Sequence, residues 1–245
     1  TGTAAHAGGS PHLGVNALYA AQMGMQAVNA LRETFQDDHH IRVHPILTAG
    51  GSSVNIIPDD VRLESYVRGA SMSCIKEANV KVNRALAGGA VSLGAKVMII
   101  DRPGYAPLNN DKNLMALARK CMEALVGADR VGFSDKWSTG CTDMGDLSCV
   151  MPAVHPYASG ATGTGHGVDY QIKDVEKACL NAAKAQLLMV EALLQNGAEK
   201  AQSIIKGCKP LYPSIKAYLA DIDQLVCDLE AVNYAEDGTI QIRIT

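Results

Sequence analysis

The sequence predicts a mixed α/β chain of the α+β type, with short strands and two long helices in its first hundred residues. Apolar residues recur at helical spacing over residues 16–33, and a second helical pattern covers residues 73–93. Residues 61–67 instead alternate between apolar and polar side chains, as a half-buried strand does. Glycine and proline separate these stretches, which makes each of them a distinct element.

The order of these elements predicts a ferredoxin-like sheet. After a strand that leads into His6, we expect elements over residues 16–33, 41–48, 61–67, 73–93 and 96–101. Read as strands and helices, this order is β-α-β-β-α-β, the split βαβ arrangement. We expect the first strand to be largely missing, because the chain begins only a few residues before His6.

A change in composition predicts the domain organisation. Pro103, Pro107 and the pair Asn109-Asn110 interrupt the regular patterns. We therefore expect a first domain over residues 1–104, a second over 105–196 and a tail over 197–245. Further expected elements are helices over 112–126 and 174–195, a strand over 151–159, and, in the tail, two short helices and a final strand over 239–244.

Composition excludes several classes of protein. The formal charge of -3 argues against nucleic acid as a partner, and no apolar run approaches the length of a membrane span. Seven scattered cysteines, an odd number, argue against a disulfide framework or a structural zinc site. We expect a cytoplasmic protein. Because the chain opens inside a motif at Thr1, we also expect it to be a piece of a longer protein.

Two histidines lie among small residues, where a ligand can approach closely. His6 follows Gly2-Thr3-Ala4-Ala5, and His166 lies in Gly163-Thr164-Gly165-His166-Gly167. A histidine in such a loop is suited to bind a metal or to transfer a proton. The alternative for His6 is a surface histidine without a role, and a single histidine decides neither question.

An amide and a guanidinium group form a second candidate set. Asn55 follows a flexible Gly-Gly-Ser-Ser run, and Arg68 ends the strand expected next. Together they could hold a carboxylate, because arginine offers a planar fork of donors that matches two oxygens. On the residues alone, a turn-forming Asn55 and a solvated Arg68 are the simpler interpretation.

A third candidate is the glycine-punctuated loop over residues 138–146, which is crowded with hydroxyl groups, a thiol and carboxylates. Such a loop can present Gly140, Thr142 and Asp143 to a ligand, although Thr142 or Asp143 could equally cap a short helix. A reactive Cys141 is the weakest interpretation, because no feature of the sequence places a base beside it.

The order of these motifs resembles one enzyme family. Gly-x-x-Ala-His-Ala precedes Pro-x-x-Gly-x-Asn-Ala-Leu, followed by Asn-Ile-Ile-Pro, a strand ending in arginine, Gly-x-Thr-Asp-Met-Gly, Val-x-Pro and a late loop histidine. This series resembles the dinuclear-metal amidohydrolases of the aminoacylase and carboxypeptidase superfamily, and is most similar to the p-aminobenzoyl-glutamate hydrolase branch. The resemblance covers about residues 2–194.

The resemblance implies a ferredoxin-like lid and dimerisation domain, followed by the C-terminal part of a zinc-peptidase-like catalytic domain. It implies that His6 stabilises the oxyanion across a homodimer and that Asn55 and Arg68 contact the substrate. It further implies that Gly140, Thr142 and Asp143 line the substrate pocket and that His166 is the last metal ligand. Cys141 occupies a position where relatives usually have serine or glycine.

The same resemblance implies two divalent metal ions, zinc or manganese, which activate water to cleave an amide whose substrate carries a free carboxylate. The usual upstream ligands, a His-x-Asp motif, a bridging acid and a Glu-Glu pair, have no room before Thr1. We therefore expect an incomplete metal site and an inactive chain by itself. The alternative function is a dimerising or ligand-binding protein without catalysis, which has kept a ferredoxin-like domain.

Overall fold

The structure is a computed structural model that describes residues 1–134, 136–138 and 140–244. It forms two compact units. The first contains Thr1–Pro107 together with Ala220–Thr245, and the second contains Leu108–Leu219. Both units combine helices with small antiparallel sheets, so the predicted α+β class is confirmed.

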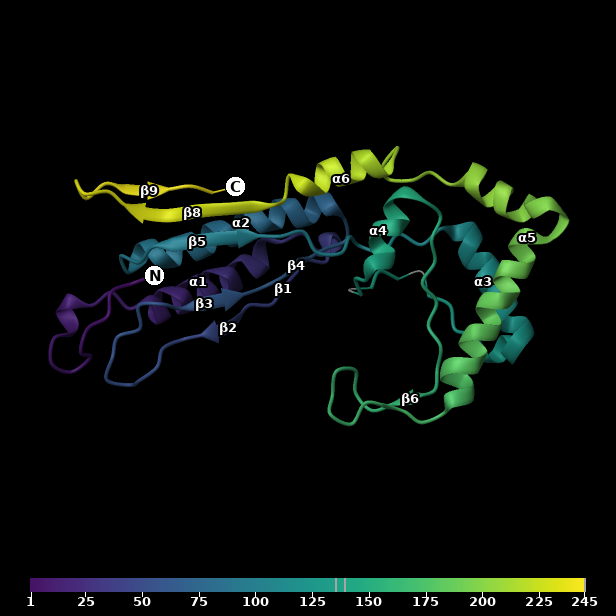
Figure 1. Cartoon of the computed structure of the whole chain (residues 1–245), viewed down its shortest axis with the longest axis horizontal. Helices are drawn as coiled ribbons and strands as arrows, with labels where there is room; N and C mark the ends of the chain where they lie inside the picture. Colours follow the sequence, from purple (N-terminus) through teal and green to yellow (C-terminus); the bar gives the residue numbers. More distant parts are fainter. Residues whose placement is uncertain (135, 139, 245) are drawn as a thin grey trace. The chain divides into compact units, whose positions relative to one another are not determined.

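Two long helices are the main elements of the first unit (Figure 1). They are α1 (Ala17–Leu31) and α2 (Met72–Ser92), and both were predicted. The side chain of Asn16 caps α1 and that of Ser71 caps α2, in each case by accepting a backbone N–H of the first turn. Short polar side chains are favoured there because they satisfy N–H groups that have no partner within the helix.

The two helices approach each other to backbone distance at a pair of glycines. A Cβ atom on Gly89 would lie 2.3 Å from the nitrogen of Gly24 and 2.8 Å from the carbonyl oxygen of Ala20. These are backbone atoms in the middle of a helix, so they have little freedom to move aside. The crossing of α1 and α2 therefore requires glycine at position 89.

Hydrophobic side chains form two core clusters around this crossing. The first cluster contains Ala20, Ala87, Ala90, Ala95 and Val232, and the second contains Val28, Ile41, Val43, Ala78 and Val82. The first cluster is mostly alanine, which suits helices this close together. The second brings α1 and α2 against the strand region, and its β-branched side chains fill the wider space.

Four short strands of the first unit form two antiparallel pairs. β1 (Arg42–Val43) pairs with β4 (Val67–Arg68), and β2 (Ile46–Ala49) pairs with β3 (Arg62–Glu64). Each of the two strands predicted in this region is thus divided in two. Pro45 lies at the first division, where its missing N–H interrupts the ladder of hydrogen bonds.

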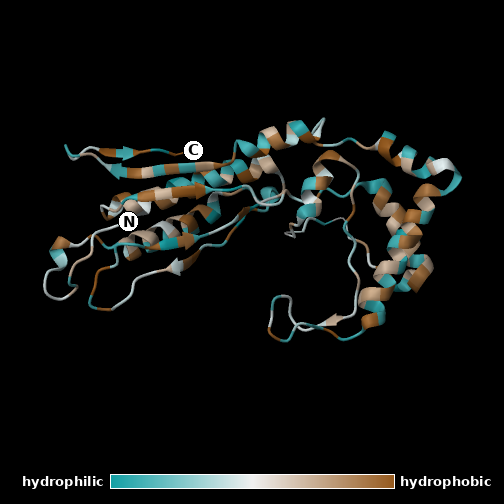
Figure 2. Ribbon diagram, in the orientation of Figure 1, coloured by the Kyte–Doolittle hydropathy of each residue, from teal (hydrophilic) through white to brown (hydrophobic). Residues whose placement is uncertain are grey.

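The third predicted strand, β5 (Val97–Asp101), is hydrophobic along most of its length (Figure 2) and pairs with the end of the chain. It lies beside β8 (Cys227–Tyr234), which in turn pairs with β9 (Ile240–Ile242). Within the described residues, the strands of this unit therefore form separate small sheets. The first residue of the chain lies at the start of this sheet, because Thr1 exchanges two backbone hydrogen bonds with Lys96, the residue before β5.

Strand β8 was missed by the sequence analysis, which expected helices before residue 239. Its side chains do alternate, with Asp228 and Glu230 exposed and Leu229 and Ala231 more buried. That pattern could have identified the strand. Only pairing with β5, more than a hundred residues earlier, gives its backbone groups their partners.

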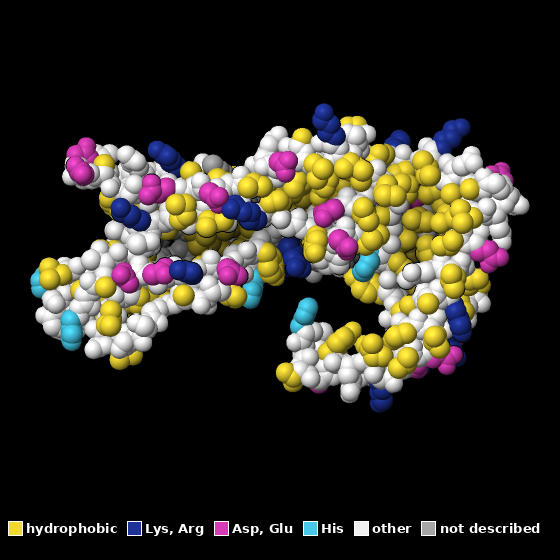
Figure 3. Space-filling view, viewed as in Figure 1, with side chains coloured by type: hydrophobic (Ala, Val, Ile, Leu, Met, Phe, Trp, Pro, Cys, Tyr) yellow, Lys and Arg dark blue, Asp and Glu magenta, His cyan; other side chains and the backbone are white. Residues whose placement is uncertain are grey.

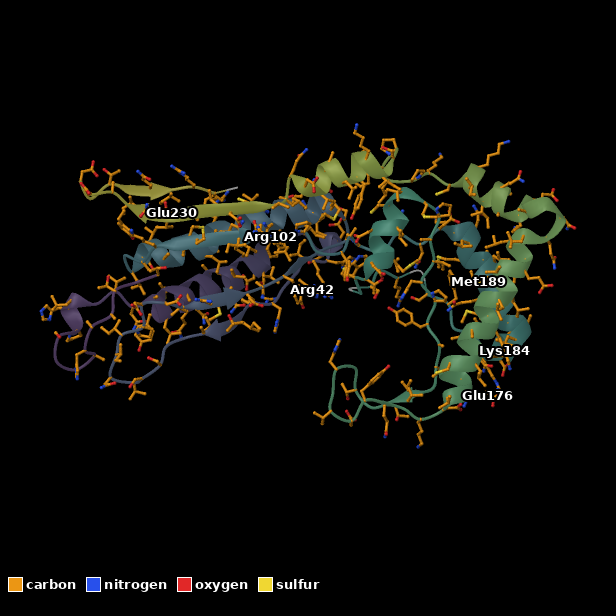
Figure 4. The ribbon with its side chains drawn as sticks, in the orientation of Figure 1. Arg42, Arg102, Glu176, Lys184, Met189 and Glu230 are labelled. Atoms are coloured by element: carbon orange, nitrogen blue, oxygen red, sulfur yellow. The ribbon has the colours of Figure 1, made fainter. Side chains whose placement is uncertain are left out.

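Polar contacts join β5 to α2 and β8. One carboxylate oxygen of Asp101 accepts hydrogen bonds from the side-chain amides of Asn79, at 2.7 Å, and Asn83, at 2.8 Å. Arg102, labelled in Figure 4, donates to the carboxylate of Asp228 at 2.7 Å. Because Asn83 is only 3% exposed, its hydrogen bond satisfies a buried amide.

The second unit is built on two predicted helices. α3 (Lys112–Val126) packs against α5 (Asn181–Gly207) through a cluster that contains Leu117, Cys121 and Ile204. A π-helical turn, η5 (Glu176–Leu180), leads into α5. The helical conformation of α5 breaks at residues 195–198, which agrees with the helix end predicted near Gln195.

The strand predicted over residues 151–159 is wrong. This segment is without regular structure, and its backbone bonds to the start of α3, where Asp111 donates to the carbonyl of Ala153 at 2.9 Å. Two strands of two residues each, β6 (Ala161–Thr162) and β7 (Gln171–Ile172), follow it and pair antiparallel. A strand requires a neighbouring strand for its hydrogen bonds, whereas residues 156–159 of this segment lie against the helices α3 and α5.

The predicted tail does not form a unit of its own. Residues 197–219 belong to the second unit and residues 220–245 to the first, with α6 (Ile215–Asp223) running across the division. The first boundary lies after Pro107, three residues beyond the predicted position.

The glycine contact yields a stability prediction. Gly89→Ala should lower the free energy of unfolding by about 1–3 kcal/mol, because the added carbon overlaps backbone atoms of α1. The matched control is Gly88→Ala on the same helix, where nothing lies within 4 Å of the added carbon. The control should raise stability by about 0.5–1 kcal/mol. Denaturant unfolding measures both, and equal effects would contradict the close packing.

Candidate functional site

Two segments that the sequence analysis singled out separately lie side by side in the first unit. Ala7 donates its N–H to the carbonyl of Asn55 at 2.9 Å, and Ile57 donates to the carbonyl of Ala5 at 2.9 Å. Between these bonds, His6 faces Ile56 across an isolated antiparallel bridge. The structure therefore brings His6 and Asn55 together.

The imidazole of His6 is held in one orientation by its own loop. Its Nδ1 atom accepts backbone N–H groups from Gly8, at 3.1 Å, and Gly9, at 2.8 Å. Because Nδ1 accepts both hydrogen bonds, the proton of the neutral imidazole belongs on Nε2. His6 is exposed, so Nε2–H is available as a hydrogen-bond donor to a ligand.

The side chain of Asn55 is also oriented. Its Oδ1 accepts a hydrogen bond from the hydroxyl of Ser53 at 2.5 Å. Asn55 is exposed, so its NH₂ group is open to solvent as a hydrogen-bond donor, and its backbone lies beside that of Ala7.

Arg68 lies elsewhere in the first unit. It belongs to β4, where it is opposite Arg42, whereas Asn55 lies in the loop that precedes β3. Figure 1 shows β4 and that loop at opposite ends of β3. The guanidinium of Arg68 lies over the ring of Tyr66, 4.5 Å from its centre. The structure therefore does not bring Asn55 and Arg68 together.

In the second unit, three candidate residues lie at the N-terminus of α4 (Asp143–Val150). Thr142 caps this helix, and its hydroxyl accepts the N–H of Met144 at 3.3 Å. Asp143 is the first residue of the helix and is exposed, and Gly140 lies just before the cap. The capping role left open in the sequence analysis is thus filled by Thr142.

His166 lies in the loop between β6 and β7. It is exposed and has a backbone φ of 64°, which is uncommon for residues other than glycine. Within the described residues, no group of three or more His, Cys, Asp or Glu side chains is arranged to hold a metal ion. The residues that the structure describes therefore do not fit a dinuclear metal site by themselves.

His155 and Tyr157 were missed by the sequence analysis. The Nδ1 atom of His155 is buried and has no hydrogen-bond partner among the described residues. Its ring meets that of Tyr157 edge-on at 5.2 Å. A carbon added to Gly140 would lie 3.5 Å from the hydroxyl of Tyr157. The run His155-Pro156-Tyr157, which lies beside a glycine-rich stretch, could have marked these two residues as candidates.

A cavity of about 280 Å³ lies between α3, α5 and residues 156–159 of the second unit. Met122, Leu125 and Met189 contribute apolar side chains to it, and Arg130 contributes a charged one. Figure 3 shows hydrophobic side chains gathered over α3 and α5, and Figure 4 labels Met189. None of the site residues predicted from the sequence lines this cavity.

Parts of the chain are similar to known proteins. Residues 1–89 match the peptidase dimerisation domain. Xaa-Arg dipeptidase from Mus musculus is 31% identical over 161 residues, which cover 64% of this chain and 36% of that protein. One of the p-aminobenzoyl-glutamate hydrolase polypeptides of Escherichia coli (strain K12) is 34% identical over 97 residues, covering 40% of this chain and 22% of that protein.

The chain is therefore similar to M20 amidohydrolases over part of its length. The resemblance inferred from the order of its motifs is thereby confirmed. The chain spans 36% of the length of the Xaa-Arg dipeptidases of Mus musculus and Homo sapiens. It is 30% identical to the human protein over 161 residues.

A solved structure, the aminobenzoyl-glutamate utilization protein from Klebsiella pneumoniae, has a TM-score of 0.42 with this chain at 19% identity. The match covers 84% of this chain and 45% of that chain. The similarity to M20 amidohydrolases rests on the sequence matches. Across the described residues, we find no helix with the length and apolarity needed to cross a bilayer.

The cap of α4 yields a second prediction. Thr142→Ala should weaken the first turn of α4 by about 1 kcal/mol, which corresponds to about fivefold faster amide exchange at Met144. Thr142→Ser keeps the hydroxyl group, so the amide of Met144 should exchange at a rate close to that in the natural protein. Hydrogen exchange followed by NMR measures both. Equal rates in the two variants would show that the cap does not stabilise this turn.

Proposed function

We propose that this chain supplies the lid and the C-terminal catalytic segment of a metal-dependent M20 hydrolase. The proposed substrate is the amide bond of an N-acyl amino acid, a p-aminobenzoyl-glutamate-like compound or a dipeptide. The match of residues 1–89 to a peptidase dimerisation domain supports this proposal, as do relatives named for dipeptide and p-aminobenzoyl-glutamate hydrolysis. The activity of the whole protein is part of the proposal.

The arrangement of His6 carries the proposal. Hydrolysis of an amide places negative charge on the carbonyl oxygen in the transition state, and a donor already held in place stabilises that charge without reorganisation. His6 provides such a donor, because its Nδ1 is occupied by Gly8 and Gly9 and its Nε2–H is exposed. Asn55 adds the NH₂ group of its amide nearby.

The other candidate residues have proposed roles around this donor. Arg68 would bind the free carboxylate of the substrate, and Gly140, Thr142 and Asp143 would line the pocket. His166 would be one metal ligand. The described residues do not complete a site for two zinc or manganese ions, so no step is assigned to a metal here. We expect this chain alone to be inactive.

A homodimer is part of the same proposal, with His6 serving the site of the partner protomer. The match of residues 1–89 to a peptidase dimerisation domain supports it. A second candidate function is dimerisation or ligand binding without catalysis, and the same match of residues 1–89 supports it.

The donor role of His6 predicts the effect of its removal. In the natural protein, supplied with zinc or manganese, His6→Ala should lower kcat about 10²–10³-fold on p-aminobenzoyl-glutamate or a dipeptide ending in arginine. His12→Ala, an exposed histidine of the following turn, is the matched control and should leave kcat unchanged. Product release followed by chromatography measures the rates.

Two outcomes would count against the proposal. An unchanged kcat in His6→Ala would remove the imidazole from the mechanism. No hydrolysis by the natural protein with either metal would favour the second candidate function.

The dimer gives an independent prediction. Light scattering on the purified chain should show a mass about twice the 25.9 kDa of one copy. A mass of one copy at all concentrations up to about 100 μM would contradict dimerisation with the affinity that a stable interface provides.

A further inference from the structure

The helix α4, which begins at the candidate substrate loop, is held by Tyr218, a residue more than seventy positions later in the chain. Tyr218, on α6, is only 7% exposed, and its hydroxyl donates to the carboxylate of Asp146 at 2.8 Å. Asp146 lies on α4, three residues after Asp143. Hydrogen bonds to a charged acceptor are among the stronger ones in proteins, so this contact ties α4 to α6.

A second contact from the same region holds the other end of α4. Tyr212 donates its backbone N–H to the carbonyl of Cys149 at 3.0 Å. Its ring meets that of Tyr218 edge-on at 5.2 Å, a favourable aromatic geometry. Tyr218 therefore contacts α4 in its middle, and Tyr212 contacts it near its C-terminus.

The segment just before α3 adds a contact on α4 between these two. The hydroxyl of Ser148 accepts the N–H of Asn109 at 3.0 Å and donates to the carbonyl of Gly145 at 2.6 Å. Ser148 is 2% exposed. Since α4 has only eight residues, contacts in its middle and at its end also fix the direction of its first turn.

The hydrogen bond from Tyr218 also affects the charges at the start of α4. Asp143 and Asp146 are three residues apart on α4, so their carboxylates are neighbours and repel each other. A hydroxyl donated to Asp146 offsets part of its charge. The carboxylate of Asp143 then remains exposed at the helix N-terminus, beside Thr142 and Gly140.

We infer that Tyr218 is a positioning residue, which acts through Asp146 to hold the first turn of α4 and so the loop of Gly140, Thr142 and Asp143. The use of that loop for substrate rests on the proposed function, whereas the positioning itself does not. The inference assigns a role to a residue of the C-terminal region, which no motif of the sequence identifies.

The ionisation of Tyr218 supports the same contact. Burial, followed by the hydrogen bond to Asp146, raises the pKa of Tyr218 above its ordinary value of 10.0. The groups facing its hydroxyl are Asp146 and Cys149 on α4 and the ring of Tyr212. In the unfolded chain this tyrosine loses its proton near pH 10, whereas in the folded chain it keeps it. Its contribution to stability is therefore present below pH 10 and lost as the pH rises further.

The test uses the natural protein and the variant Tyr218→Phe, which removes only the hydroxyl. Amide exchange at Met144 and Gly145 should become at least about tenfold faster, as expected for losing a hydrogen bond to a charged group. Exchange in α3 and α5 should not change. Tyr170→Phe, the same substitution at an exposed position of this unit, is the matched control and should leave exchange at α4 unchanged.

Two further measurements separate positioning from general stability. Asp146→Asn keeps an acceptor for the hydroxyl of Tyr218, so the amides of Met144 and Gly145 should exchange within about threefold of their rates in the natural protein. Above pH 10 the unfolding constant of the natural protein should rise by up to about tenfold per pH unit more than that of Tyr218→Phe. Unchanged exchange at Met144 in Tyr218→Phe would overturn the inference. Faster exchange spread evenly through the unit in both Tyr218→Phe and Asp146→Asn would also overturn it.

Activity distinguishes this inference from the proposed function. If the natural protein hydrolyses the amide substrates, Tyr218→Phe should raise KM with a smaller change in kcat, because the loop binds substrate in the proposal. If neither protein hydrolyses them, the proposed function fails, and the exchange rates still decide whether Tyr218 positions α4.

Discussion

The close crossing of α1 and α2 is the constraint on which the first unit depends. Gly24 and Gly89 let the two backbones touch, and both core clusters are arranged around this crossing. A side chain larger than hydrogen at position 89 would separate the helices and with them the surfaces that support the strands. Asn79 and Asn83 then connect α2 to the end of β5 through one carboxylate, that of Asp101. The positions of the strands and loops in the first unit thus depend on the close crossing of this helix pair.

The candidate site around His6 is placed by backbone contacts next to this helix pair. Residues 5–7 precede α1 and residues 55–57 precede β3, and hydrogen bonds between their backbones place His6 beside Asn55. The imidazole is then oriented by two glycine N–H groups, which needs no other side chain. In the second unit the same principle applies to α4, whose capped first turn carries Thr142 and Asp143 while Tyr218 and Tyr212 hold its body. In both units, local turns orient the functional groups and distant segments hold those turns.

Prediction from the sequence succeeded where a pattern is local. The helices α1, α2 and α3 are marked by periodic apolar residues and by capping side chains at their starts, and their positions were predicted closely. Prediction failed where an element requires a distant partner. β8 needs β5 for its hydrogen bonds, and residues 151–159 pair with no strand in the part of the chain that the structure describes. The hydrophobic alternation of a strand does not say which other strand, if any, will pair with it.

The sequence by itself determined the class of fold and the positions of the main helices, because periodicity and caps are properties of neighbouring residues, and the order of its motifs indicated the similarity to M20 amidohydrolases. It also identified His6, Asn55, Arg68 and the loop before α4 as candidates. Only the tertiary structure decided that His6 meets Asn55 while Arg68 lies beyond β3, and that Tyr218 reaches Asp146. These contacts join residues far apart in the chain, so they exist only once the intervening helices have packed.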